Sequence, residues 1–460
     1  MRFPFLDRKE ESMRLRALFS RREGALAVLY GRRRCGKSRL LQETLPQARS
    51  VYYVADDREA PLQRAALASE IARLLPGFAD VGYPDWDALF GRWWRDARPG
   101  MVLALDEFPS LVTSGREVPS LLQKRIDQGA ATGVHLVLSG SSQRMMQGLV
   151  LDRTAPLFGR ATEVLRIGPL GAGWTSAALG LRDEPRVVEA FAVWGGVPRY
   201  WELAADAGEL HRAVRILVLS PLGVLHDEPR SLLLDDLREV TQANSILALV
   251  GAGCHRLSEI AGRLGKPATS LARPLARLLD LGLVRRDLPF GATTRESKRT
   301  AYRLADPFLR FWFRFVEPNR SRLQARLVTD VARDVAHGFP HHVAGIWEDL
   351  VRESVPRARY FGRDWGGATS WWGAGRDRAP LEVDVVAETA DRRSLLVGEV
   401  KWSDRVDRDR ELATLKRKAD NLPLAEGREV LLALWVRGSP RGVGRPADCF
   451  TPREVLRVLR

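Results

Sequence analysis

The first third of the chain alternates short apolar runs with segments whose apolar residues recur at helical spacing. Buried strands are predicted for four of these runs, at 25–30, 50–55, 101–105 and 134–139. Segments 61–75 and 86–97 carry apolar residues every three or four positions, which predicts helices between the strands. Strands and helices in this order predict an α/β fold.

The segment after the first strand has the spacing of a phosphate-binding loop. Gly31, Gly36, Lys37 and Ser38 stand in the order G-x-x-x-x-G-K-S. Glycines let main-chain N–H groups turn toward an anion, and the start of the next helix adds partial positive charge. Lys37 can reach the outer phosphates of a nucleotide, Ser38 can bind Mg²⁺, and Arg39 completes the predicted nucleotide-binding set. A chance glycine-rich turn is the alternative, but strand, spacing and helix all favour a nucleoside triphosphate site.

Two acidic residues, Asp106 and Glu107, end the apolar run that begins at Met101. A buried strand that carries an acid to its tip is what a second nucleotide motif requires. Asp106 would hold Mg²⁺ through water, and Glu107 would orient or deprotonate an attacking water. The next predicted strand ends at Ser139 and leads into Ser141 and Ser142. Any of these three serines can sense a γ-phosphate, although a simple strand-end turn explains them equally well.

Later segments extend this pattern, with LSGSS at 138–142, LFGR ending at Arg160 and GGVPRY at 195–200. Taken in order with GRRRCGKS and LALDEF, they resemble the archaeal-type P-loop ATPase family of the STAND branch of AAA-like ATPases, over roughly residues 1–220. The resemblance implies a parallel sheet, ATP and Mg²⁺ as ligands, Asp106 and Glu107 as the Walker B pair, and Pro198 against the adenine. Arg160 is a candidate for stabilising transition-state charge, but the family's frequent Gly-Arg-Arg reads Gly-Arg-Ala at 159–161 here.

Residues 235–304 change character and predict a winged helix-turn-helix. Helices are expected at 237–250, 256–264 and 268–279, and two strands are expected around a basic hairpin at 291–299. In such folds the third helix can enter the major groove while the wing touches phosphate. The expected DNA-facing residues are Arg273, Arg277, Arg295, Lys298 and Arg299. The alternative is a packing module that makes no DNA contact.

The last third carries a second candidate chemistry on two predicted strands, 381–387 and 394–402. Alternate residues of a strand share a face, so Glu399 and Lys401 point the same way, and Asp384 on the paired strand can join them. Two carboxylates and an ammonium suit metal-assisted phosphodiester hydrolysis. The alternative is that E-x-K is only a salt bridge on the solvent face of a strand.

The pattern D-x(14)-E-x-K after a helical glutamate resembles the PD-(D/E)xK nuclease superfamily, over about residues 335–460. The resemblance implies a restriction-endonuclease-like fold with Asp384 and Glu399 as metal ligands, Lys401 as the catalytic lysine and Glu348 as an auxiliary acid. Val383 stands where the family often has proline. Lys416 and Lys418, on a following helix predicted at 410–422, can face DNA phosphate.

Composition changes this picture only in part. The chain has 460 residues and a formal net charge of +15, which suits a polyanionic partner. No apolar run approaches the roughly 20 residues that span a bilayer, and the N-terminus lacks an apolar signal core, so we expect a cytoplasmic protein without a membrane segment. Three widely spaced cysteines predict neither a disulfide framework nor a zinc site.

These observations predict five parts. They are a P-loop ATPase core (1–170), a helical lid (171–234), a winged helix-turn-helix (235–305), linking helices (306–334) and a nuclease-like domain (335–460). The leading hypothesis is an ATP-regulated DNA-binding protein with a Mg²⁺-dependent nuclease, and assembly into a homo-oligomer is left open. The runner-up is a STAND-type switch whose C-terminal domain binds DNA or protein without cleaving. A toxin or defence module is neither supported nor excluded.

Overall fold

The computed structural model describes residues 3–129, 132–236, 240–293, 299–438 and 448–460. These residues form two compact units, which we describe separately. The N-terminal unit contains Phe5–Pro169, and the C-terminal unit contains Leu170–Leu233 together with the described residues from 240 onward. No helix in the described ranges is both long enough and apolar enough to cross a membrane.

The N-terminal unit is built on a five-stranded sheet in the order β2-β3-β4-β1-β5, whose neighbours all pair in parallel. The strands are β1 (Leu26–Tyr30), β2 (Ser50–Val54), β3 (Val102–Asp106), β4 (His135–Gly140) and β5 (Glu163–Arg166). The predicted α/β fold with a parallel sheet is therefore confirmed. In a parallel sheet the carboxyl ends of the strands share one edge, and this edge holds the first candidate site.

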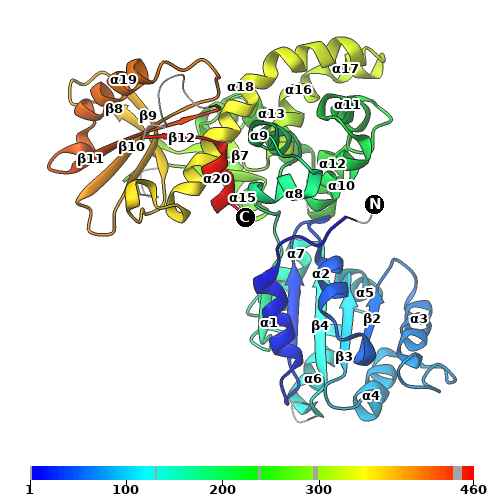
Figure 1. Ribbon diagram of the computed structural model, residues 1–460. Helices are drawn as coiled ribbons and strands as arrows, with labels where there is room; N and C mark the ends of the chain where they lie inside the picture. The colour runs from blue at the N-terminus through cyan, green and yellow to red at the C-terminus, as the bar shows by residue number, and fades with distance from the viewer. Residues whose placement is uncertain (1–2, 130–131, 237–239, 294–298, 439–447) are drawn as a thin grey trace. The chain divides into compact units, whose positions relative to one another are not determined.

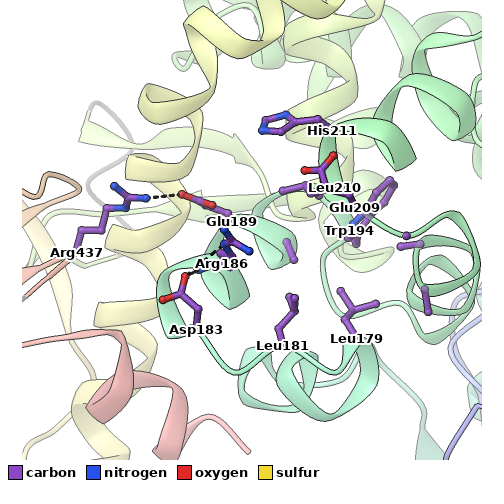
Figure 2. Close-up of a pocket in the computed structure, with 14 residues that line it drawn as sticks. Leu179, Leu181, Asp183, Arg186, Glu189, Trp194, Glu209, Leu210, His211 and Arg437 are labelled. Carbon is purple, nitrogen blue, oxygen red and sulfur yellow. Dashed lines mark hydrogen bonds and ion pairs between the residues drawn. The ribbon is translucent and has the colours of Figure 1, made fainter.

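Helices cover both faces of this sheet (Figure 1). They are α1 (Lys9–Phe19), α2 (Lys37–Thr44), α3 (Ala60–Ala72), α4 (Trp86–Asp96), α5 (Phe108–Ser114), α6 (Val118–Gly129) and α7 (Gln143–Met146). Alternate residues of β1 explain the two layers. Leu26 and Val28 join the core under α3 and α4, whereas Ala27 and Leu29 join the core under α1 and α2.

The C-terminal unit begins with helices α8 (Thr175–Leu179), α9 (Glu184–Trp194), α10 (Pro198–Ala207), α11 (Leu210–Val214) and α12 (Glu228–Asp236). Three helices and a hairpin follow: α13 (Val240–Gly251), α14 (Leu257–Leu264), α15 (Ala268–Asp280), β6 (Val284–Asp287) and β7 (Ala301–Leu304). The two strands pair antiparallel. Arg295 and Lys298 of the predicted wing lie outside the described residues.

The segment after β6 is attached to the second sheet of the same unit. The Phe290 main-chain N–H donates to the Ser370 carbonyl oxygen at 2.9 Å. The Phe290 side chain packs against a core that includes Trp371 and Val383. The residue just before the predicted hairpin at 291–299 is therefore covered by protein, and the predicted contact of that hairpin with phosphate stays a prediction.

Three helices lead into the second sheet, namely α16 (Pro307–Phe315), α17 (Arg320–Gln324) and α18 (Val328–Ser354). The helix predicted at 343–351 is the last part of α18, which spans 27 residues. Pro340 lies inside α18 and the helix continues past it. The aromatic segment α16 is almost entirely buried, as its dense apolar sequence indicates.

The second sheet has the order β12-β11-β10-β9-β8 and mixed directions. Its strands are β8 (Thr369–Ala374), β9 (Pro380–Glu388), β10 (Ser394–Lys401), β11 (Glu429–Val436) and β12 (Cys449–Phe450). β8, β9 and β10 pair antiparallel, while β11 is parallel to both β10 and β12. Helix α18 contacts β9 and β10, α19 (Arg408–Asn421) packs on β10 and β11, and α20 (Pro452–Val458) ends the chain (Figure 1).

Candidate functional site

The loop between β1 and α2 has a backbone that only glycine adopts without strain at two positions. Gly31 has φ 148° and Gly36 has φ 89°. A Cβ on Gly31 would stand 2.1 Å from the Ile167 carbonyl oxygen, so a larger residue is excluded there. The buried Lys37 ammonium donates to the carbonyl oxygens of Gly31 at 2.9 Å and Arg32 at 3.2 Å. The loop thus holds its lysine inside the curve where a phosphate would lie.

Asp106 meets the end of this loop at the carboxyl edge of the sheet. The Ser38 hydroxyl and the Tyr52 hydroxyl each donate to Asp106 Oδ2 at 2.6 Å. Burial, followed by the charge of Asp106, raises the pKa of Tyr52. The Glu107 N–H donates to Asp106 Oδ1 at 3.0 Å. A hydroxyl and a carboxylate from distant segments are side by side, and these are donors that Mg²⁺ prefers, so the residues fit the ion.

The second acid of the pair, Glu107, faces the tip of β4. Its φ of 51° places it in the left-handed region at the start of α5. Glu107 Oε2 accepts from the Ser141 main-chain N–H at 3.2 Å and from the Ser141 hydroxyl at 2.9 Å. Ser139, the predicted sensor, is fully buried, and its hydroxyl has no hydrogen-bond partner among the described residues. Ser141, one of the three serines considered at this strand end, is therefore the one that contacts Glu107, and the sensing of a γ-phosphate stays a prediction.

Arg160, the candidate for stabilising transition-state charge, lies away from the phosphate loop of its own chain, and its role stays a prediction. Arg160 precedes β5, and the Thr162 N–H donates to the Leu26 carbonyl oxygen at the first residue of β1. Arg160 therefore lies at the amino edge of the sheet, a full strand of roughly 15 Å from the phosphate loop. Its guanidinium forms two hydrogen bonds to Asp127, at 2.7 and 2.8 Å.

Two other residues of the predicted nucleotide set have defined local roles. Arg39 lies in the first turn of α2 and pairs with Glu43 at 2.7 Å on the same helix. Pro198 is the first residue of α10 in the C-terminal unit, where its fixed φ suits the start of a helix. Its contact with adenine stays a prediction.

The second candidate site lies where β9 meets β10. Gly398 pairs with Val385, so the next position of this antiparallel register places Glu399 opposite Asp384. The Val400 main-chain N–H donates to Asp384 Oδ2 at 2.9 Å. Burial and the nearby charge of Glu399 raise the pKa of Asp384. Two mostly buried carboxylates therefore stand next to each other on neighbouring strands.

A β-bulge helps to aim Asp384. Trp371 of β8 pairs with Val383, but Thr369 pairs with Val386, so β9 carries one extra residue in this interval. Asp384 lies within that interval. Bulges re-aim side chains and are common next to functional sites.

Two lysines hold the other carboxylate. Lys401 Nζ donates to Glu399 Oε1 and Lys418 Nζ donates to Glu399 Oε2, both at 2.8 Å. Burial opposes the charge of Lys401, but its hydrogen bond to Glu399 raises the pKa of this lysine overall. Lys401 has a second acid, Glu411, at 4.0 Å. Lys418 is the lysine predicted to face DNA phosphate, and its contact with Glu399 is not evident from the sequence pattern.

Glu348 approaches the same site from α18. Burial raises its pKa to about 7, Arg352 opposes this increase, and Asp384 adds to it. Arg352 lies 3.5 Å from Glu348 and donates to the Asp384 main-chain carbonyl oxygen at 2.9 Å. The predicted set of Glu348, Asp384, Glu399 and Lys401 is thus gathered from one helix and two strands.

Arg352 is itself fixed by Asp349, the neighbour of Glu348. Asp349 pairs with Arg285 of β6 and Arg310 of α16, both at 2.6 Å, and with Arg352 at 2.7 Å. Burial alone would raise the pKa of Asp349, yet the three guanidinium groups hold it well below its usual range. One carboxylate therefore ties the hairpin, α16 and α18 together beside the candidate site.

The acids of this second site supply only part of the ligands that a divalent cation needs. Within the described ranges, no group of three or more His, Cys, Asp and Glu side chains is arranged to hold a metal. Asp384 and Glu399 nevertheless supply two carboxylates at one place, which fits an ion that fills its remaining positions with water and phosphate, as Mg²⁺ does. They are the residues that would hold it.

The predicted DNA-facing arginines of α15 are exposed. Leu271, Leu275 and Leu278 form its buried face, and Arg273 and Arg277 lie away from it. Neither arginine makes an ion pair with a described residue. Arg299 is the third member of the predicted set that the structure describes. It directly follows residues 294–298, which lie outside the described ranges.

Family models match two segments of the chain. Residues 5–202 match the model described as "ATPase domain predominantly from Archaea", and residues 312–413 match one described as "Archaea bacterial proteins of unknown function". The first match covers the phosphate loop, the Asp106 strand and Pro198. Residues 5–202 are therefore an ATPase domain of archaeal type. The second match covers Glu348, Asp384, Glu399 and Lys401 and assigns them no role.

Similar proteins extend over most of the chain. A protein of Methanocaldococcus jannaschii, itself named as uncharacterized, is 27% identical over 409 residues, which cover 88% of this chain and 89% of the relative. The Walker-type ATPase of Pyrococcus abyssi is 20% identical, with a TM-score of 0.49 over 67% of this chain and 96% of that one. The ORC2 protein of Aeropyrum pernix, solved as ADPNP and ADP complexes, is 16% identical, with a TM-score of 0.46 over 71% and 96%.

Proposed function

We propose that this protein is an ATP-controlled, metal-dependent nuclease that acts on DNA. The observation that carries the proposal is the opposition of Asp384 and Glu399 on β9 and β10, with a lysine donating to each oxygen of Glu399. Carboxylates that bind a metal and ammonium groups that bind phosphate are what phosphodiester hydrolysis requires. The net charge of +15 supports a polyanionic substrate.

Each residue of this site has a proposed role. Mg²⁺ bound by Asp384 and Glu399 would supply a Lewis acid and a water of lowered pKa. Lys401 donates to a phosphate oxygen or orients the attacking water. The Val400 N–H and Arg352 hold the Asp384 side chain and main chain in place. Glu348, with its pKa of about 7, exchanges a proton near neutral pH.

The finer description of the C-terminal unit belongs to this proposal. Three helices followed by an antiparallel hairpin have the order of a winged helix-turn-helix, and the exposed Arg273 and Arg277 of α15 would contact DNA. A mixed sheet with α18 before it and α19 within it suits a restriction-endonuclease-like fold. Because the Phe290 segment is attached to β8, the helices rather than this part of the wing would hold the duplex.

ATP is the proposed controlling ligand. Lys37 and the loop N–H groups would hold its phosphates, Ser38 and Asp106 would hold Mg²⁺, and Glu107 would orient water from its contact with Ser141. The hydroxyls on Asp106 are neutral partners that an ion can displace. ATP binding or hydrolysis in this unit would then control the nuclease of the other unit.

A second candidate function is a STAND-type switch whose C-terminal unit binds DNA or protein without cutting. The observation that favours it is that both Glu399 oxygens already have lysine partners. In that function the two lysines would be permanent partners of the acid, and ATP hydrolysis would act as a timer.

One experiment separates the two. The full chain is incubated with linear, circular and single-stranded DNA, with and without ATP, in Mg²⁺ or Mn²⁺. Asp384→Asn and Lys401→Ala are expected to abolish cleavage and to leave ATP hydrolysis unchanged, whereas Lys37→Ala abolishes ATP hydrolysis. Glu382→Gln, at an exposed acid on β9, is the matched control and should cut like the unaltered protein. Equal cleavage by Asp384→Asn and the unaltered protein would falsify the nuclease assignment, and DNA binding without cleavage would favour the switch.

A further inference from the structure

Lys418 and Lys401 differ in the acidic partners that each would still have if Glu399 bound another group. Lys401 retains Glu411 at 4.0 Å. Lys418 pairs with Glu399 at 2.8 Å and has no other acidic partner among the residues that the structure describes. A cation that takes Glu399 therefore leaves Lys418 uncompensated while Lys401 keeps a counter-charge.

The position of Lys418 allows it to turn outward. Leu415 and Ala419 pack into the core, so α19 itself stays fixed on the sheet. The Lys418 side chain is 27% exposed, and the adjacent Lys416 and Arg417 are exposed on the same helix. A lysine ammonium on a flexible four-carbon stem can exchange partners without any movement of its helix.

We propose that Lys418 is an exchange group that makes metal binding and nucleic-acid binding cooperative at this site. A divalent cation takes the Glu399 carboxylate, and the released Lys418 ammonium donates to a phosphate of the DNA backbone. The cation removes Glu399 from Lys418 and so frees the lysine for DNA, and DNA removes Lys418 from Glu399 and so frees the acid for the cation. Each ligand therefore strengthens the binding of the other by the same factor. This inference rests on the proposed nuclease function and adds to it that DNA controls the occupancy of the metal site.

The cooperativity also explains how two lysines on one metal-ligating acid can be useful. Without DNA the acid is neutralised by fixed cations, so the metal competes for it and binds weakly. When DNA is bound, its phosphate oxygens offer the Lys418 ammonium a charged acceptor that can replace the Glu399 carboxylate. The site would therefore load its metal only when a polyanion is present.

The test measures Mn²⁺ binding to the full chain by electron paramagnetic resonance, with and without a short phosphorothioate duplex that resists cleavage. Asp384→Asn, titrated in parallel, accounts for Mn²⁺ held by the duplex and by the ATPase domain. We expect the duplex to raise the Mn²⁺ affinity of the Asp384-dependent site by at least about fivefold, the lower range of coupling between two sites.

Lys418→Met should raise that affinity in the absence of DNA by a similar factor, and DNA should then add nothing. Arg417→Met, which removes one positive charge from an exposed position of α19, should behave like the unaltered protein, and Lys418→Arg should keep the cooperativity. Thermal unfolding confirms that each variant is folded, and Lys418→Gln replaces the methionine variant if that one is not.

The outcomes separate this inference from the function on which it rests. If the protein binds Mn²⁺ and cleaves DNA but Lys418→Met and Lys418→Gln bind Mn²⁺ like the unaltered protein, the exchange is wrong and the nuclease stands. If Mn²⁺ never binds in an Asp384-dependent way, the nuclease function fails and the exchange fails with it.

Discussion

The acids Asp106 and Glu399 of the two candidate sites have hydrogen-bond donors of opposite kinds, neutral in one site and charged in the other. In the N-terminal unit, Asp106 is surrounded by the neutral hydroxyls of Ser38 and Tyr52 and by a main-chain N–H. In the C-terminal unit, Glu399 is held by two ammonium groups. An ion that enters the first site displaces neutral groups, but an ion that enters the second must displace charge. If both sites bind metal as proposed, the first would accept a metal–nucleotide complex directly, whereas the second would depend on a further ligand that takes one of the lysines.

The largest expected effect tests whether the two sites are structurally independent. Asp349→Ala leaves three arginines together without their carboxylate, and breaking a buried pair in this way costs about 3 kcal/mol or more. We expect the C-terminal unit to unfold at a much lower denaturant concentration, as measured by the fluorescence of its tryptophans. Binding of an ATP analogue to the N-terminal unit should persist under the same conditions.

The control for this variant is Asp364→Ala, which removes an exposed partner of Arg359. It should leave the unfolding midpoint nearly unchanged. The lowered pKa of Asp349 also fixes the sign of its pH dependence. Its contribution is complete above the unfolded-state pKa of about 3.9 and is lost as the pH falls below that value. Loss of ATP-analogue binding by Asp349→Ala would show that the sites are not independent.

A smaller effect is expected from pH, and it should appear at only one of the two sites. Glu348 has a pKa of about 7, so it is protonated below neutral pH and charged above it. Mn²⁺ affinity at the Asp384-dependent site should therefore rise severalfold as the pH increases through 7. Glu348→Gln should remove this step and leave ATP binding unaltered. A step that persists in Glu348→Gln would have to arise from another group.

The smallest effect concerns Arg160 in the N-terminal unit. Arg160→Ala removes a surface ion pair with Asp127, and pairs of this kind contribute little to stability. Because Arg160 lies at the amino edge of the sheet, ATP hydrolysis by dilute protein should not change. Asp127→Ala is the matched variant and should have the same small effect on stability. A loss of hydrolysis that grows with protein concentration would instead place Arg160 at the nucleotide of a neighbouring copy.

Much of the N-terminal site could be predicted because its chemistry is contiguous in sequence. The loop 31–38 and the strand that ends at Asp106 are local patterns, and a parallel sheet brings their ends to one edge without further information. The position of Arg160 at the amino edge could not be predicted from such local patterns. Its position depends on where β5 begins in the register with β1, and no local pattern around residue 160 specifies that edge.

The C-terminal site was predicted in part, because alternation along a strand places Glu399 and Lys401 on one face. The bulge at Asp384 and the pairing of Asp349 with three arginines depend on contacts between distant segments, which one sequence does not reveal. Lys418 did carry a usable signal. It lies three residues after Leu415 and four before Leu422, so helical periodicity places it beside the buried face of α19.

The attachment of Phe290 to β8 has a consequence for where a cut would fall. The hairpin that follows α15 is pinned at Ser370, and Arg285 of the same hairpin is held by Asp349, so α15 cannot swing freely from the second sheet. If Arg273 and Arg277 bind a DNA duplex, the distance along the duplex from the bound segment to Asp384 would be constant. Such an enzyme would measure length, and its products would end a set number of base pairs from the gripped segment.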